Sequence, residues 1–320
     1  MSELIRVENL KKYFPTPGGM LHAVDDVNFS INEGDTLGVV GESGCGKSTL
    51  GRTVLKLLEP TDGKIFYKGQ DITDLHGKAF AETRKKMQLI FQDPYSSLNP
   101  RLCVSELIAD PLKANHLLDK KGRQDRVYEL MDMVGLSRRF AFSYPHELDG
   151  GRRQRIGVAR ALALDPEFIV CDEPVSALDV SIQAQILNLL QDLQEQHHLT
   201  YIFVTHDLSV VRHISTDIMV MYIGAVVEKS PAKELFELPL HPYTKGLLSA
   251  IPNPNIDAPR NKIELRGELT SPIEPKNECR FCARCKYASE LCHASAPKLE
   301  EVRPNHFVAC HHVKEINQLA

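Results

Sequence analysis

The chain has 320 residues, and its 38 basic and 42 acidic side chains give a formal net charge of −4. Hydrophobic residues make up 42% and charged residues 25%, a balance that is typical of globular proteins and argues against long disordered segments. The slight acidity argues against a dedicated nucleic-acid binder. The most apolar run, residues 218–227, is too short to span a bilayer, which needs about 20 apolar residues, and residues 1–8 lack the layout of a signal peptide. We therefore expect a cytosolic protein with no nucleic-acid partner.

Short β-branched segments alternate with helix-length amphipathic segments over the first 230 residues. This alternation predicts an α/β fold with a mostly parallel sheet. Turn signals at residues 17–19 and 32–34 indicate that the earliest strands form antiparallel hairpins. The expected strands are residues 4–8, 24–31, 36–40, 64–67, 88–91, 168–171, 201–204, 217–221 and 225–228.

The composition changes at two places along the chain. The strand signal disappears between residues 94 and 146, where helical spacing predicts a helical insertion. After Pro231 the chain becomes rich in proline, which marks a domain boundary. We expect one domain over residues 1–235 and a smaller, loop-rich C-terminal module over residues 236–320.

A phosphate-binding loop is the most specific pattern in the chain. Residues 41–48 read Gly-Glu-Ser-Gly-Cys-Gly-Lys-Ser and fit G-x4-G-K-[ST], between an expected strand and a helical segment. Glycines let successive backbone N–H groups turn towards phosphate oxygens, and a helix N-terminus adds positive potential. Lys47 can reach the β- and γ-phosphates, and Ser48 can hold Mg²⁺ through its hydroxyl. The pattern predicts a nucleotide site formed by Gly41, Ser43, Gly44, Cys45, Gly46, Lys47, Ser48 and Thr49.

Two acidic residues, Asp172 and Glu173, follow the apolar segment 168–171. In a phosphate-loop ATPase the first such acid helps to hold Mg²⁺, and the next can orient or deprotonate the attacking water. The phosphate loop upstream favours this interpretation over that of an ordinary solvated loop.

Further motifs resemble those of the ATP-binding-cassette ATPases over about residues 4–230. They are Ile-Phe-Gln-Asp-Pro at 90–94, Leu-Asp-Gly-Gly-Arg at 148–152, Ser-Ala-Leu-Asp at 176–179 and Thr-His-Asp at 205–207. The resemblance implies a cassette ATPase core, in which a mostly parallel sheet with the phosphate loop is joined by an antiparallel β subdomain and a helical insertion. It also implies that two such subunits assemble head-to-tail around two nucleotides.

The same resemblance implies a role for each motif. Glu173 would be the catalytic base, Lys47 would contact the phosphates, and His206 would sense the γ-phosphate. Gln92 would link Mg²⁺ and the γ-phosphate to the helical insertion, and Phe14 or Tyr13 would stack on adenine. The implied Mg²⁺ ligands are Ser48, Gln92 and Asp172, and the residues facing the nucleotide of the opposite subunit are Asp149, Gly150 and Gly151.

Within this family the chain looks most like the peptide-importer branch. The resemblance rests on residues 41–49, 91–101, 174–181, 241–244 and 267–272 and covers almost the whole chain. It implies the second ATPase subunit of an oligopeptide or dipeptide importer, paired with a related ATPase subunit on the cytoplasmic face of the membrane. Two integral permease subunits and an extracytoplasmic peptide-binding protein would complete the complex. Nickel or glutathione importers, and a soluble cassette ATPase outside transport, remain alternatives.

The signature motif departs from the family pattern. This chain has Asp149 and Arg152 where the family usually has serine and glutamine. In the family that serine donates a hydrogen bond to the γ-phosphate, which an ionised aspartate cannot do. Two like unit charges, such as those of an aspartate and a phosphate, repel by about 4 kcal/mol at 4 Å and an effective dielectric constant of 20. Arg152 lies one helical turn from Asp149, so it can pair with it or take over the phosphate contact. We expect this signature to serve a modified or slow site on the partner, the alternative being that an exposed loop tolerates aspartate.

Five of the eight cysteines lie in the last 42 residues. In a reducing compartment such a cluster favours a metal over disulfides. The tails of similar peptide importers carry four cysteines that match Cys279, Cys285, Cys292 and Cys310, and the resemblance implies a [4Fe–4S] cluster there. Zinc and metal-free thiols remain alternatives, and Cys282 is an extra thiol that could compete as a ligand.

Overall fold

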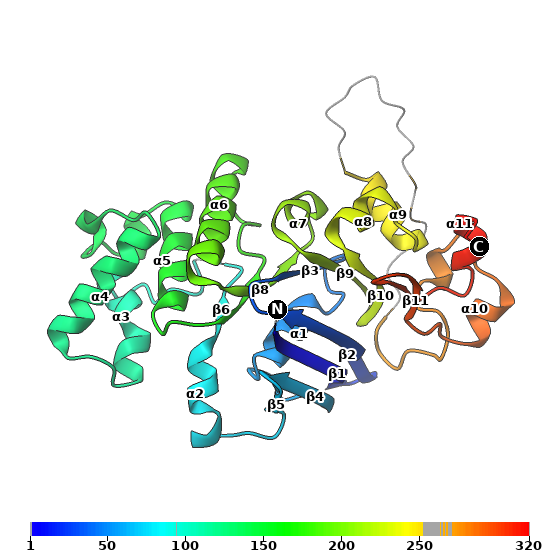
Figure 1. The fold of residues 1–320 in the computed structure, drawn as a ribbon, viewed down its shortest axis with the longest axis horizontal. Helices are drawn as coiled ribbons and strands as arrows, with labels where there is room; N and C mark the ends of the chain where they lie inside the picture. The colour runs from blue at the N-terminus through cyan, green and yellow to red at the C-terminus, as the bar shows by residue number, and fades with distance from the viewer. Residues whose placement is uncertain are drawn as a thin grey trace. The chain divides into compact units, whose positions relative to one another are not determined.

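The computed structural model describes residues 2–93, 95–251, 263, 265, 267 and 271–319. It divides into two compact units, one formed by Met1–Thr73 and Phe203–Ala320 and the other by Asp74–Ile202 (Figure 1). The tail beyond residue 235 belongs to the same unit as the N-terminal strands, so the compact units follow a different division from the expected domains. Parts of three sequence features lie outside the described residues. They are Pro94 of the motif at 90–94, the prolines Pro252, Pro254 and Pro259 of the proline-rich stretch, and residues 268–270 of the motif at 267–272.

The first unit contains an antiparallel sheet in the order β2-β1-β4-β5. Its strands are β1 (Glu3–Thr16), β2 (Gly19–Asn32), β4 (Asp62–Tyr67) and β5 (Gln70–Asp71). The hairpin expected at residues 17–19 is confirmed, because β1 and β2 pair up to Thr16 and Gly19. The hairpin expected at residues 32–34 is wrong: β3 (Thr36–Val40) joins another sheet. Every residue of β3 is buried, and such a strand needs cover on both faces.

The second sheet of this unit is mixed, with the strand order β11-β12-β10-β9-β3-β8. β3 and β9 are parallel, whereas β9, β10, β12 and β11 pair antiparallel to one another. Helices α7 and α8 lie together over β3, β9 and β10 (Figure 1). The bounds are β8 (Thr200–Thr205), α7 (Leu208–Ile214), β9 (Asp217–Tyr222), β10 (Ala225–Pro231), α8 (Ala232–Glu237), β11 (Glu300–Arg303) and β12 (His306–Val308).

The C-terminal tail adds to both sheets instead of folding apart from them. β12 pairs with β10, and residues 272–274 run beside β2 through the hydrogen bonds from His22 N to Pro272 O and from Glu274 N to Met20 O. Its own hydrophobic cluster is small, with Leu240, Val308 and Val313 buried at its centre. The remaining elements of the tail are short: α9 (Pro242–Ser249), the 3-10 turn η3 (Cys282–Arg284), α10 (Glu290–Ala294) and α11 (Val313–Asn317).

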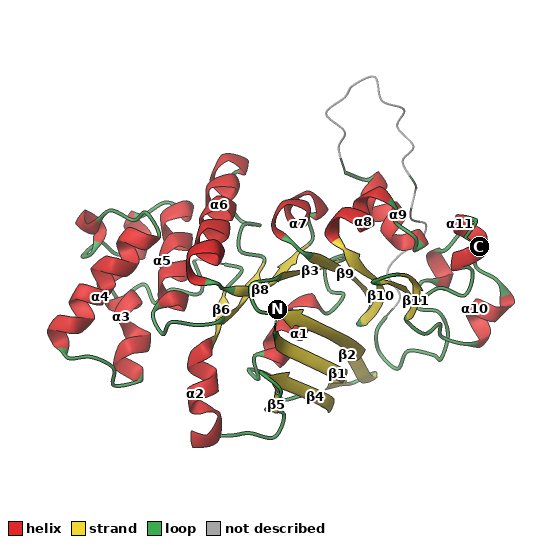
Figure 2. Cartoon of the chain, viewed as in Figure 1, coloured by secondary structure: helices red, strands yellow, loops and turns green. Residues whose placement is uncertain are grey.

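The second unit is mostly helical (Figure 2). Its parallel strands β6 (Met87–Ile90) and β7 (Phe168–Asp172) pair side by side, and α3, α4 and α5 pack against one another. The helical insertion expected over residues 94–146 is confirmed for the residues described there, which contain no strand. The other bounds are α2 (Lys78–Lys86), α3 (Val104–Ala114), α4 (Lys120–Met133), η1 (Arg138–Phe140), η2 (Pro145–Glu147), α5 (Gly150–Leu162) and α6 (Val180–His197).

All nine expected strands are present, with ends that differ by a few residues. The strands β5, β11 and β12 were not expected, because they have only two to four residues and therefore carry little periodic strand signal. Among the described residues, no helix is long and apolar enough to cross a membrane.

Candidate nucleotide site

The phosphate loop connects β3 to α1 (Lys47–Val54) and is held tightly by its glycines. Gly41 and Gly46 have φ values of 151° and 103°. A Cβ atom at Gly46 would lie 1.9 Å from the carbonyl oxygen of Ala23, and one at Gly41 would lie 2.2 Å from that of Met221. Larger residues would therefore push the loop off the strands beneath it. Ser43 and Gly44, in the middle of the loop, are exposed to solvent.

Lys47 is only 4% exposed, and its ammonium group lies among the loop's own acceptors. Its Nζ donates to the carbonyl oxygens of Gly41 at 2.8 Å and Glu42 at 3.0 Å. Ser48 and Thr49 follow in the first turn of α1, which contains no acidic residue and has no side-chain cap. The N-terminal end of α1 thus presents positive potential and a lysine to the same loop, which is the arrangement that binds phosphate.

The C-terminal tail contacts the phosphate loop through Glu42. The guanidinium group of Arg284 makes two hydrogen bonds to the Glu42 carboxylate, at 2.6 and 3.0 Å. The backbone N–H of Glu42 donates to the hydroxyl of Tyr243 at 2.9 Å. Tyr243 belongs to the His-Pro-Tyr-Thr motif at residues 241–244, so this motif supports the loop directly. The contact joins residues 201 positions apart, so the motif alone does not predict it.

A second arginine of the tail, Arg280, binds beside the expected adenine stacker. It pairs with Asp25, which also accepts a hydrogen bond from the hydroxyl of Tyr13. The Tyr13 ring stacks on His22, with centroids 3.8 Å apart and planes 17° apart. One face of the Tyr13 ring is covered in this way, and the ammonium group of Lys12 lies over the Phe14 ring, 4.9 Å from its centroid.

The second unit brings Gln92 and Glu173 together. β6 and β7 run parallel, so the residues that follow them lie at the same edge, and Gln92 Nε2 donates to Glu173 Oε2 at 2.9 Å. Asp172, the last residue of β7, is 1% exposed. Glu173 has a φ of 46°, a left-handed conformation that is uncommon for a residue with a side chain and is enriched at functional sites.

The signature motif forms the beginning of α5 in the same unit. Asp149 caps the helix, because its Oδ1 accepts from the backbone N–H of Arg152 at 2.8 Å. Its Oδ2 pairs with the guanidinium group of Arg152 at 2.7 Å, which is the first of the two contacts that the sequence analysis considered. Gly150 and Gly151 occupy the first positions of the helix.

The predicted residues are thus distributed over both units. The phosphate loop, Phe14 and His206 belong to the first unit, and His206 follows β8 in an exposed position. Gln92, Asp172, Glu173 and the signature residues Asp149, Gly150 and Gly151 belong to the second unit.

Two family models match the chain. The model described as ABC transporter matches residues 24–176, and the model described as the C-terminal region of oligopeptide/dipeptide transporters matches residues 227–292. The oligopeptide transport ATP-binding protein AppF of Bacillus subtilis is 49% identical over 318 residues, covering 96% of this chain and 97% of AppF. The dipeptide transport ATP-binding protein DppF of Haemophilus influenzae is 47% identical over 316 residues, covering 97% of each. The chain belongs to the ABC transporter ATPase family.

The solved structures agree with this assignment. The dimeric post-hydrolysis state of the ATP-binding cassette MJ0796 bound to ADP and Pi aligns with a TM-score of 0.66 and 31% identity, covering 72% of this chain and 99% of that one. The expected cassette fold is therefore confirmed. As an ABC ATPase, the protein uses ATP with Mg²⁺.

Burial raises the pKa values of two tail thiols of this ABC ATPase, to about 12 for Cys279 and about 11 for Cys310. Other tail thiols contribute to these shifts: Cys292, Cys282 and Cys310 at Cys279, and Cys285 and Cys292 at Cys310. These cysteines, Cys282 included, therefore lie in one region of the described tail.

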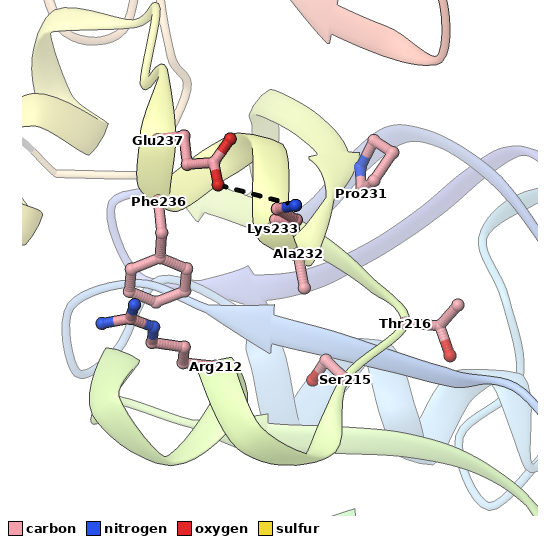
Figure 3. Close-up of a pocket in the computed structure, with 8 residues that line it drawn as sticks. All are labelled: Arg212, Ser215, Thr216, Pro231, Ala232, Lys233, Phe236 and Glu237. Atoms are coloured by element: carbon pink, nitrogen blue, oxygen red, sulfur yellow. Dashed lines mark ion pairs between the residues drawn. The ribbon is translucent and has the colours of Figure 1, made fainter.

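A separate hollow of about 430 Å³ lies between α7 and α8 of the ABC ATPase (Figure 3). Arg212 lies over the ring of Phe236 at 5.3 Å, and Lys233 pairs with Glu237 at 3.9 Å. None of the residues lining this hollow is among those predicted to bind nucleotide, so we assign it no part in ATP binding.

Proposed function

We propose that this ABC ATPase energises the import of oligopeptides or dipeptides across the cytoplasmic membrane. The observation that carries the proposal is the C-terminal region of the peptide-transporter type, which reaches the phosphate loop through Tyr243 and Arg284. The relatives with the same overall length are oligopeptide and dipeptide transport ATP-binding proteins. A C-terminal region of the oligopeptide/dipeptide-transporter type that contacts the phosphate loop supports a link between this transport branch and ATP use.

In the proposed chemistry, Lys47 and the backbone N–H groups of the phosphate loop hold the nucleotide phosphates. Ser48, Gln92 and Asp172 would hold Mg²⁺, which would neutralise charge on the phosphates. Glu173 accepts a proton from the attacking water, and its hydrogen bond to Gln92 positions the carboxylate. His206 contacts the γ-phosphate, and Phe14 stacks on adenine.

We further propose that the subunit works as a heterodimer with a related ATPase subunit. Support comes from the dimeric cassette bound to ADP and Pi. Asp149, Gly150 and Gly151 would face the nucleotide of the partner, and the Asp149–Arg152 pair would make that site slow. The dimer would dock on two integral permease subunits at the cytoplasmic face, and an extracytoplasmic peptide-binding protein would deliver the ligand.

We infer that Cys279, Cys285, Cys292 and Cys310 would hold a [4Fe–4S] cluster, as the resemblance to peptide-importer tails implies. A single zinc ion with four thiolate ligands is the alternative. No three of these sulfurs, all of them in the described tail, lie within 4.8 Å of one another, so metal analysis and not sulfur spacing distinguishes the two. A bound cluster would act as a structural staple for the tail.

The test is peptide-stimulated ATP hydrolysis by the assembled complex, with wild type compared with Glu173→Gln. We expect the substitution to lower the stimulated rate at least about 100-fold, because the general base is lost. Retained turnover would assign hydrolysis to the partner subunit. If an intact complex responds to nickel or glutathione but not to peptides, the transported ligand is not a peptide. Hydrolysis without any complex would favour a soluble ATPase.

A further inference from the structure

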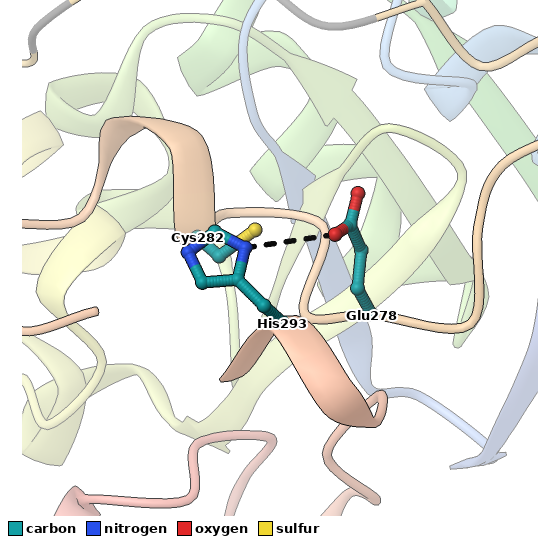
Figure 4. Close-up of side chains that lie close together, drawn as sticks. All are labelled: Glu278, Cys282 and His293. Atoms are coloured by element: carbon teal, nitrogen blue, oxygen red, sulfur yellow. Dashed lines mark ion pairs between the residues drawn. The ribbon is translucent and has the colours of Figure 1, made fainter. Parts of the chain in front are cut away.

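One compact set of metal-ligand atoms in the tail does not consist of the four expected cluster cysteines. Within the described part of the chain, Glu278, Cys282 and His293 bring a carboxylate oxygen, a sulfur and an imidazole nitrogen within 4.8 Å of one another. Figure 4 shows the three side chains pointing towards a common point from the loop before Cys279, from η3 and from α10.

The backbone places these donors. The N–H of Cys279 donates to the carbonyl oxygen of Cys292 at 2.8 Å, and the N–H of Cys282 donates to that of Cys279 at 2.9 Å. Glu278 precedes Cys279 and His293 follows Cys292, so the hydrogen bond between Cys279 and Cys292 brings Glu278 and His293 across from each other. Cys282 is carried towards them by the turn that the second hydrogen bond closes.

The spacing and the chemistry both suit zinc. Oxygen and nitrogen ligands at about 2.1 Å from a tetrahedral zinc ion lie about 3.4 Å apart. The distance from His293 Nδ1 to Glu278 Oε2 is 3.6 Å without a metal. One thiolate, one imidazole and one carboxylate form a donor set that borderline divalent cations accept.

The burial of the three side chains is graded. Cys282 is 7% exposed, whereas the side chains of Glu278 and His293 are 30% and 58% exposed. The soft ligand therefore lies deepest, and the two harder ligands lie nearer to solvent. With three protein ligands, water can occupy the fourth coordination position of a tetrahedral ion.

We propose that Glu278, Cys282 and His293 bind a divalent cation of the zinc class, with water as the fourth ligand, separately from the four-cysteine set. The bound ion ties residues 278–282 to α10. The fifth tail cysteine thereby has a role of its own and does not compete for the cluster.

The test is equilibrium dialysis of the full chain against Zn²⁺, with zinc, iron and acid-labile sulfide measured in the same samples. We expect about one zinc per wild-type chain in this site. Glu278→Gln, Cys282→Ser and His293→Gln should each weaken zinc binding at least about tenfold while the iron content stays unchanged. Glu290→Gln, which changes an exposed carboxylate of α10 outside the set, is the matched control and should bind zinc as wild type does.

Three results would overturn the proposal. They are a wild-type chain that binds no zinc, zinc binding that is unchanged in Glu278→Gln and His293→Gln, and loss of iron together with zinc in Cys282→Ser. The last result would make Cys282 a cluster ligand. Because His293 and Glu278 are partly exposed, their variants keep the test valid even if Cys282→Ser does not fold.

Discussion

At the scale of single residues, the altered signature is explained by a local contact. Asp149 is a favourable N-cap for α5, and its second carboxylate oxygen pairs with Arg152. Serine can cap a helix but cannot form that ion pair. The two departures from the family pattern therefore support each other in this chain, and the arginine offsets the negative charge that aspartate brings.

This arrangement makes a prediction about Asp149. Replacing it with alanine removes the cap and should lower the free energy of unfolding by about 1 kcal/mol, whereas Asp149→Ser should cost less because serine caps as well. In the assembled complex, Asp149→Ser with Arg152→Gln should hydrolyse ATP faster than wild type. Urea unfolding and steady-state hydrolysis measure the two effects. Wild-type behaviour of both the single and the double variant would refute the idea of compensation.

Arg284 is a second residue whose role follows from its contacts. It places a positive charge on Glu42, within the loop that must bind a polyanion. Without Arg284, the Glu42 carboxylate would lose its ion-pair partner beside the phosphates of bound ATP, and the phosphate loop would be held less tightly. Both effects weaken ATP binding.

We expect Arg284→Gln to raise the KM for ATP about tenfold with little change in kcat, as befits a positioning residue. Lys286→Gln alters an exposed cation two residues away and serves as the control. In a Glu42→Gln background, Arg284→Gln should add little, because the pair is already broken. Additive losses in the double variant would mean that Arg284 acts by another route.

At the scale of elements, α9 shows how the tail is attached to the cassette. His241 caps this helix, with its Nδ1 accepting from the N–H of Tyr243 at 3.1 Å. Complete burial lowers the pKa of His241 from 6.5 to about 4, so the ring is neutral at pH 7, as an acceptor nitrogen requires. Glu228, from β10, accepts from the backbone N–H groups of Leu240 and His241 and fixes the start of the helix.

This buried histidine predicts a pH dependence of stability. Between pH 6.5 and 4 the unfolded chain binds a proton at His241 that the folded chain does not bind. The free energy of unfolding should therefore fall as the pH drops through that window, by about 3 kcal/mol in total. His241→Asn keeps a capping oxygen and should lack this contribution. Urea unfolding of both proteins at pH 7 and pH 4 measures it, and equal losses in the two would show that His241 is not responsible.

At the scale of the whole molecule, the tail is ordered by packing against the rest of its unit as well as by its own small cluster. Leu240, Val308 and Val313 form the centre of that cluster, with Cys310 packed at its edge, and the buried Phe281 and Tyr243 pack on Tyr222 of β9. A bound metal centre would add a further staple.

Removing one ligand of the proposed cluster should affect both metal content and folding. Cys310→Ser should lower the iron content from about four atoms per chain to below one and make the tail more sensitive to proteolysis. Cys103→Ser, which changes a cysteine of the helical unit, should leave iron in place. Iron and acid-labile sulfide analysis decides the outcome, and zinc in place of iron in the wild type would exclude the cluster.

Much of the fold could be predicted from the sequence because its signals are local. A buried β-branched strand, a glycine loop and a helix start follow one another at residues 36–48, and each depends on its own neighbours in the chain. The same holds for Asp172 and Glu173, whose position at a strand end follows from the apolar run before them. The parallel pairing of β6 and β7 then accounts for the contact between Gln92 and Glu173.

The contacts that join distant segments depended on the tertiary structure. No spacing rule relates Arg284 to Glu42, or His293 to Glu278 across the fold of the tail, since ion pairs and metal sites form wherever packing brings the groups together. β12 pairs with the edge of β10 and β11 pairs with β12, and both strands are too short for their own residues to signal them. The cassette and its phosphate loop are encoded in neighbouring residues, and the sequence therefore predicts them. The support that the tail gives the loop consists of long-range contacts, and these form when distant segments pack together in the folded chain.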